Sequence, residues 1–168
     1  EGKPQSQSGY VFNEDYPFLG PPSYPPGFPL MLAPVYALWG HSIKAFMLFI
    51  TACLFLLSVL LIAWYLKYFS RIESFFMVLV FIYNPFMLYF KMEIMSEIPF
   101  TLLLLGGVML TGSKRIAPVP RAVLTGLTAA MLCSTRSIGI AFPAAVVIHG
   151  LIQLKHKNRQ EKNEQLLT

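Results

Sequence analysis

Charge is scarce in this sequence of 168 residues. Asp, Glu, Lys and Arg make up only 12% of it, whereas hydrophobic residues make up 55%, and the mean hydropathy is +0.58. Soluble globular domains carry about 25% charged residues, so the shortage argues against a fold that is surrounded by water on all sides. The composition predicts a protein whose solvent is largely the lipid bilayer.

Cysteine and acidic residues are also few. Cys53 and Cys133 each lie in an apolar stretch, where a free cysteine behaves as a small hydrophobe, and their spacing offers no metal site. The net charge is +5, but the basic residues are dispersed among loops and do not gather with aromatic residues on one surface. We therefore expect no nucleic-acid partner.

The sequence does not start with methionine or with a signal peptide. It starts at Glu1, and no basic start, short apolar core and small-residue cleavage site open it. We expect a fragment or processed piece of a longer protein, with further functional residues upstream.

Uncharged apolar stretches fill most of the rest. Residues 45–66 form the first, with twenty-two residues and no charge, which exceeds the roughly 20 residues that a bilayer-crossing helix requires. Residues 74–90 form the second, with Pro85 near its far end, where a helix can break or kink. Each stretch predicts a membrane-spanning helix.

The third stretch, residues 98–112, has only fifteen residues, so we expect its helix to begin earlier and to cover residues 92–112. Glu93 and Glu97 would then share one face, where two like charges repel and raise the pKa of one carboxyl. Such a carboxylate could serve as a base, a metal ligand or a hydroxyl anchor. Alternatively, Glu93 and the nearby Lys91 are loop residues that face water.

The last stretch, residues 122–154, is too long for one span and slightly short for two. Basic residues flank both of its ends, so the positive-inside rule predicts two crossings, over residues 121–135 and 137–154. Arg136 would lie at the outer turn between them. A guanidinium there can bind a phosphate through two N–H donors, or it can simply extend toward the lipid headgroups.

These assignments predict an all-α fold, a polytopic transmembrane helical bundle with a Pro-rich external loop. Residues 1–41 are expected to form the external loop and an interfacial segment, and residues 42–154 the five membrane helices. Residues 155–168 are expected to form a cytoplasmic basic tail or loop. The Pro-rich segment that starts at Tyr24 should be stiff, because proline fixes φ, and could wall a site at the membrane surface.

Four short motifs occur in order along the chain. They are Tyr24-Pro25-Pro26-Gly27-Phe28-Pro29-Leu30, Asn84-Pro85, Met95-Ser96-Glu97-Ile98-Pro99-Phe100 and Thr135-Arg136-Ser137-Ile138-Gly139. Taken in this order, they resemble those of the GT-C membrane glycosyltransferases, in particular the bacterial members related to protein O-mannosyltransferases and aminoarabinose transferases. The resemblance extends over residues 24–154.

The resemblance implies a partial GT-C fold and a multi-pass enzyme, expected in the bacterial inner membrane. Such an enzyme takes a sugar from a polyprenyl-phosphate carrier and transfers it to a hydroxyl of a glycan, lipid or protein acceptor on the non-cytoplasmic face. Glu97 corresponds to an acidic residue of the second external loop, and Asp15 stands in for one of the first, so both are candidate catalytic residues. A requirement for a divalent metal is left open. The candidate substrate-binding residues are Tyr24, Lys91, Glu93 and Arg136, with the cationic ones stabilising the lipid phosphate.

Two other functions compete with this one. A transporter or flippase subunit would also use short broken helices with buried charges, although the long Pro-rich and aromatic external loop argues against it. A purely structural membrane subunit would leave Glu97 and Arg136 without a role.

Overall fold

The computed structural model describes residues 11–13, 16–19 and 25–165. Within that part the fold is all-α, as the sequence predicts, apart from one short antiparallel pair of strands near the N-terminus. The strands are β1 (Val11–Asn13) and β2 (Tyr16–Leu19). They occupy part of the segment that was expected to be an irregular loop.

Helix α1 (Gly27–Trp39) begins at the glycine of the Pro-Pro-Gly sequence, with Pro26 as its N-cap. It ends at Gly40, whose φ of 62° is a left-handed conformation that other residues rarely adopt. The side chains of Tyr36 and Trp39 are 50% and 61% exposed. Both rings are thus exposed, and the interfacial position of this segment stays a prediction.

Helix α2 (Ile43–Tyr65) begins where the Ser42 hydroxyl accepts a hydrogen bond from the Ala45 N–H, a typical helix N-cap. It coincides with the first predicted span. Among the described residues it alone has the length and composition of a membrane-crossing helix. One such helix is weak evidence for a membrane protein, because a core helix of a soluble protein meets the same criteria.

The second predicted span is divided into two helices, α3 (Arg71–Ile82) and α4 (Pro85–Met92). Helix α3 ends at its C-cap Tyr83, and Asn84 is the N-cap of α4, because its side-chain oxygen accepts a hydrogen bond from the Phe86 N–H. Pro85 has no N–H to donate and is well suited to the first helical position. Two helices therefore cover residues 74–90, and they meet at Pro85, where the sequence marked a possible break or kink.

Helix α5 (Glu97–Thr111) starts five residues later than predicted, because the chain becomes extended at Glu93 after α4 ends. Helix α6 (Pro118–Thr135) and the short 3-10 helix η2 (Ser137–Ile140) follow it. Helix α7 (Ala141–Gln165) continues well beyond residue 154, so much of the predicted tail is helical.

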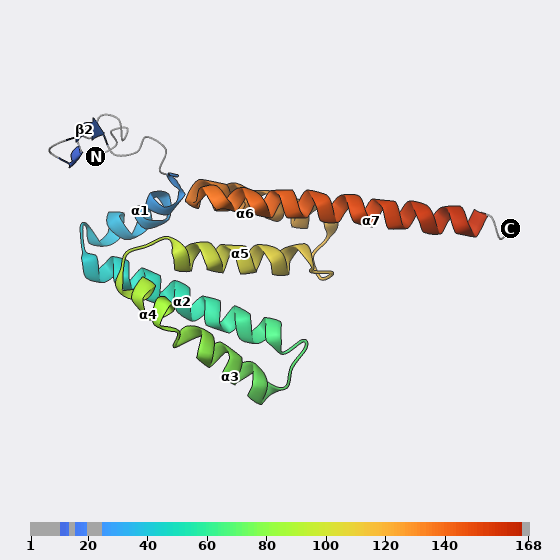
Figure 1. Ribbon diagram of the computed structural model, residues 1–168, viewed down its shortest axis with the longest axis horizontal. Helices are drawn as coiled ribbons and strands as arrows, with labels where there is room; N and C mark the ends of the chain where they lie inside the picture. The colour runs from blue at the N-terminus through green and yellow to red at the C-terminus, as the bar shows by residue number, and fades with distance from the viewer. Residues whose placement is uncertain (1–10, 14–15, 20–24, 166–168) are drawn as a thin grey trace.

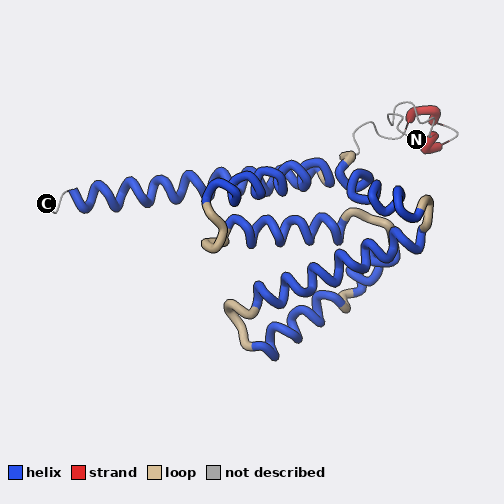
Figure 2. Tube along the Cα trace, turned by 180° about the vertical axis from the view of Figure 1, so that it is seen from behind, coloured by secondary structure: helices blue, strands red, loops and turns tan. Residues whose placement is uncertain are grey.

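The long helices run back and forth along one direction (Figures 1 and 2). Helices α2, α5 and α7 run away from the N-terminal end, and α3, α4 and α6 return toward it. The turns at residues 66–70 and 112–117 therefore lie at one end of the bundle, and the start of α5 and the end of α6 lie at the other. The end of α7 projects past its neighbours.

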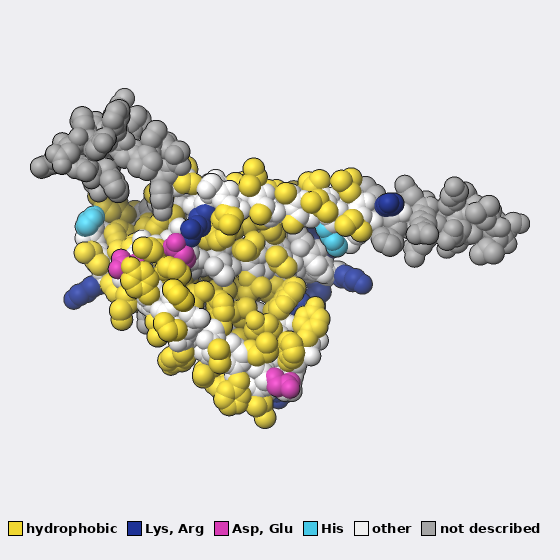
Figure 3. Space-filling model, viewed as in Figure 1, with side chains coloured by type: hydrophobic (Ala, Val, Ile, Leu, Met, Phe, Trp, Pro, Cys, Tyr) yellow, Lys and Arg dark blue, Asp and Glu magenta, His cyan; other side chains and the backbone are white. Residues whose placement is uncertain are grey.

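The core gathers around α2. Ile50 and Leu57 of this helix are fully buried, and they belong to one cluster with Phe28 of α1, Val78 of α3 and Ile98 of α5. The outer surface is apolar as well, as Figure 3 shows for one face. Exposed fractions reach 68% for Phe55, 70% for Val80 and 71% for Phe86. Large apolar side chains therefore occupy both the core and the outer surface of the bundle.

Candidate functional site

Glu97 is fixed in place by its neighbours at the start of α5. Ser96 precedes it at the N-cap and is 3% exposed, while Ile98 and Pro99, which follow it, are fully buried. Proline is favoured in a first helical turn, because the N–H groups there have no partner within the helix. The buried residues on both sides hold the Glu97 backbone where its carboxylate projects from the helix end.

Arg136 occupies the junction between α6 and η2, in an extended conformation with φ −149° and ψ 143°. Its N–H donates to the Leu132 carbonyl at 3.1 Å, and its own carbonyl accepts from the Gly139 N–H at 2.9 Å. Gly139 lies directly against the backbone of Leu132 and Cys133, where no Cβ would fit. The junction is therefore a tight turn, held by two backbone hydrogen bonds, that directs the Arg136 side chain toward α5.

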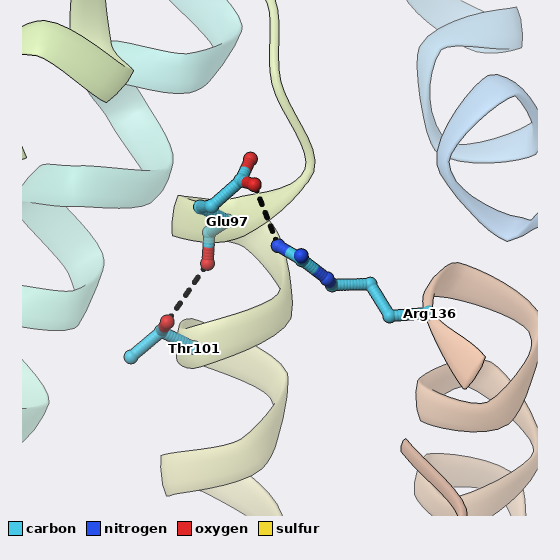
Figure 4. A network of polar contacts seen from close by, with 3 residues as sticks. All are labelled: Glu97, Thr101 and Arg136. Carbon is cyan, nitrogen blue, oxygen red and sulfur yellow. Dashed lines mark hydrogen bonds and ion pairs between the residues drawn. The ribbon is translucent and has the colours of Figure 1, made fainter. Parts of the chain in front are cut away.

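The two residues form an ion pair across α5 and α6. Arg136 Nη1 lies 2.7 Å from Glu97 Oε1, and Figure 4 shows the guanidinium reaching from the end of α6 to the start of α5. The Thr101 hydroxyl donates to the Glu97 backbone carbonyl at 2.8 Å and supports the same turn. A charge-assisted contact of this length is among the stronger hydrogen bonds in proteins.

Burial of the pair is partial and unequal. The side chain of Arg136 is 37% exposed and that of Glu97 is 25% exposed. Glu97 Oε2 is covered and has no hydrogen-bond partner within the described part of the chain. A buried carboxylate oxygen without a hydrogen-bond partner costs free energy. Glu97 Oε2 can therefore accept a hydrogen bond from a further donor.

Phe100 lies one helical turn after Glu97 and contacts the same guanidinium. The Arg136 Cζ is 5.9 Å from the centre of the Phe100 ring, which is within the range of a cation–π contact. Phe100 and Glu97 together hold the guanidinium from two directions and leave its outer part facing solvent.

The Pro-rich motif comes to this end of α6 through Gly27. A Cβ on Gly27 would lie 2.5 Å from the Ser134 carbonyl carbon and 2.7 Å from the Thr135 nitrogen. Only glycine allows α1 to approach the α6 backbone this closely. Since Thr135 precedes Arg136, Gly27 lies beside the end of α6 from which the Arg136 side chain extends.

The structure brings together two of the six predicted site residues, Glu97 and Arg136. Glu93 is exposed and belongs to the turn after α4, so the prediction that it shares a helical face with Glu97 is wrong. The repulsion predicted between the two carboxylates on a shared helical face therefore does not apply. Asp15 and Tyr24 lie outside the described residues, as does the side chain of Lys91.

Sequence reasoning found both members of the ion pair but did not pair them. The glycine in Pro25-Pro26-Gly27 was the one available signal for the approach of α1 to α6. Nothing in the sequence marked Phe100 as a partner of Arg136, because aromatic residues are abundant throughout the chain. Among the described residues, no group of three or more His, Cys, Asp or Glu side chains lies close enough to hold a metal ion.

Comparisons of the chain with protein-family models, with curated proteins and with solved structures found no match.

Proposed function

We propose that this chain is part of an integral-membrane glycosyltransferase of the GT-C type. The enzyme moves a sugar from a polyprenyl-phosphate donor to an acceptor hydroxyl on the non-cytoplasmic face of the membrane. The observation that carries the proposal is the contact of Glu97 Oε1 and Arg136 Nη1 at 2.7 Å, at the end of two apolar helices. A carboxylate and a guanidinium in this place supply the base and the phosphate-binding cation that such a transfer requires.

The distribution of charge supports a polytopic membrane protein. The turn at residues 66–70, the start of α3 and the turn at residues 112–117 carry basic residues and lie at one end of the bundle. Glu93 and Glu97 lie at the opposite end together with Lys44, Lys91 and Arg136, whereas Glu73 at the start of α3 is the carboxylate of the first end. The first end is thus the more positive of the two. Under the positive-inside rule the first end faces the cytoplasm, and the large apolar side chains exposed between the two ends face lipid.

In the proposed reaction, Arg136 binds the donor phosphate and Glu97 receives the acceptor proton. The phosphate competes with Glu97 for the guanidinium and so releases the carboxylate. The acceptor oxygen then gives its proton to Glu97 and attacks the anomeric carbon. The bond from that carbon to the phosphate oxygen breaks, and the polyprenyl phosphate leaves with the electron pair, its added charge stabilised by Arg136.

The role of Glu97 is tested by Glu97→Gln in the natural full-length protein. The amide keeps the size of the side chain but cannot take a proton, so we expect transfer to fall by about 100-fold or more, the usual contribution of a general base. Transfer is measured from a polyprenyl-phosphate sugar at equal protein levels in membranes. Glu93→Gln, on the exposed turn nearby, is the matched control and should retain most of the activity.

A wild-type rate for Glu97→Gln would assign Glu97 a structural role. A rate that falls equally in Glu97→Gln and Glu93→Gln would also contradict the proposal, because the two carboxyls differ in burial and only one contacts Arg136.

The membrane topology gives a second prediction. Five crossings, made by α2, the α3–α4 pair, α5, α6 and α7, place the N-terminus outside and the C-terminus in the cytoplasm. Single-cysteine variants at Ser8 and Asn163 should therefore react with an impermeant reagent from opposite sides of the membrane. Labelling of both from one side would refute the arrangement.

A transporter or flippase is the second candidate, and two interruptions between consecutive helices favour it. One interruption lies at Asn84 and Pro85, and the other at Arg136. Broken helices of this kind line substrate pathways in transporters. The two functions differ in outcome, because a transferase consumes the lipid-linked sugar and releases polyprenyl phosphate, whereas a flippase moves the donor across the bilayer unchanged.

A further inference from the structure

A groove between α6 and α7 lies toward the end of the bundle opposite the Glu97–Arg136 pair. Its volume is about 400 Å³, within the range of about 300 to 1,000 Å³ typical of ligand pockets. Small and apolar residues line most of it, including Ala122 and Gly126 of α6 and Val147 and Gly150 of α7. Its polar members include Arg121 and His149.

Arg121 is held at the mouth of the groove. Its Nη1 donates to the Ser113 carbonyl oxygen at 2.7 Å, which ties the start of α6 to the turn after α5. Arg121 precedes Arg136 by fifteen positions, or about 22 Å at the helical rise of ~1.5 Å per residue. The guanidinium is therefore well separated from the proposed catalytic pair.

Positive charge outnumbers negative charge at this end of the bundle, where Glu73 lies at the start of α3. Lys114 and Arg115 lie in the turn after α5 and are exposed, and the sequence has no Asp or Glu between residues 98 and 160. Within the described residues, the one ion pair is that of Glu97 and Arg136. The cations at this end thus favour an anionic ligand.

The apolar walls of the groove leave space for a ligand. Gly126 of α6 and Gly150 of α7 both line the groove, and a Cβ on either would meet nothing within 4 Å. A ligand needs no polar group along this apolar part of the groove. A ligand that fits has an apolar body and one anionic end.

We propose that this groove binds an anionic phospholipid, with its phosphate on Arg121 and the neighbouring cations and an acyl chain along α6 and α7. The inference rests on the membrane arrangement proposed above and not on the transferase chemistry. In that arrangement the basic end faces the cytoplasm, where basic pockets between membrane helices bind anionic headgroups. A neighbouring protein helix could fill the apolar part but would leave the cations without a partner.

Thermal unfolding of the purified full-length protein in detergent micelles tests the site. Phosphatidylglycerol at about fivefold its Kd should raise Tm by about 2 to 4 °C. Phosphatidylcholine and inorganic phosphate should not, because the first lacks the net charge and the second lacks the acyl chain. Arg121→Gln, which keeps a polar side chain but removes the charge, should reduce the shift.

Filling the groove provides the decisive variant. Gly126→Leu should abolish the shift by phosphatidylglycerol, and Gly150→Leu is the independent second variant should the first not fold. Gly106→Leu is the matched control, since Gly106 is also in a helix with open space around it but does not line the groove. It should keep the full shift.

The proposal is overturned if both lipids raise Tm equally, if phosphatidylglycerol has no effect, or if the shift persists when leucine fills the groove. No sugar donor is present in this experiment, so its result is independent of the transferase assay. Loss of lipid binding with intact transfer would reject the groove alone, and intact lipid binding without transfer would reject the proposed enzyme alone.

Discussion

Arg136→Ala in the full-length protein is expected to reduce transfer from a polyprenyl-phosphate sugar by about 30-fold, which corresponds to about 2 kcal/mol for a lost charge-assisted contact. Arg136→Lys should also weaken donor use, although less. An ammonium is a point charge and cannot form the paired N–H contacts by which a guanidinium binds phosphate. The measurement is the rate of transfer as a function of donor concentration in membranes.

Removal of Arg136 also leaves the Glu97 carboxylate partly buried without its cation, and this alone could destabilise the protein. The double variant Glu97→Gln with Arg136→Ala separates the two effects, because it removes the isolated charge. We expect the double variant to recover thermal stability but not donor use. Recovery of both would show that the pair is structural.

Arg71 at the start of α3 provides the matched control. It is exposed and lies at the opposite end of the bundle, so Arg71→Lys should leave donor use unchanged. An Arg that merely extends to the lipid headgroups is replaced well by Lys. Wild-type donor use by Arg136→Lys would therefore remove Arg136 from the proposed site.

Gly27→Ala is expected to be strongly destabilising. Its Cβ would lie 2.5 Å from the Ser134 carbonyl carbon and 2.6 Å from the Ser134 oxygen, and these backbone atoms cannot rotate away as a side chain can. Overpacking of this kind costs about 1 to 3 kcal/mol, so Tm should fall by about 5 °C or more. Separation of α1 from α6 should also lower transfer.

Gly106→Ala, in contrast to Gly27→Ala, is expected to stabilise the protein. Nothing lies within 4 Å of a Cβ at this position, and alanine is favoured over glycine inside a helix by about 1 kcal/mol. Thermal unfolding of the two variants in the same detergent compares them directly. Equal effects would show that the close approach of α1 to α6 does not depend on the missing side chain of Gly27.

Gly107 shows why the neighbouring glycine is a poor control. A Cβ there would lie 2.7 Å from the Phe142 ring and 3.0 Å from the Thr128 methyl group. Of the two adjacent glycines, only Gly107 therefore serves close helix packing. Consecutive residues of a helix point in different directions, and the sequence does not say which of them meets a partner.

The sequence by itself determined where helices form. Residues 45–66 and 121–135 coincide closely with α2 and α6, because apolar content, proline and capping residues act locally. It also marked Pro85 as a break, since the missing N–H acts wherever the residue lies. The break between α4 and α5 was missed because no proline or glycine marks residues 93–96.

Only the tertiary structure decided which of the candidate residues meet. Glu97 and Arg136 contact each other because α5 and α6 pack antiparallel, so the start of one helix lies beside the end of the other. Glu93, closer to Glu97 in the chain, is turned away by the extended backbone after α4. Helix formation depends on neighbours within a few residues, whereas contacts between helix ends depend on helix length and packing direction, which no short motif encodes.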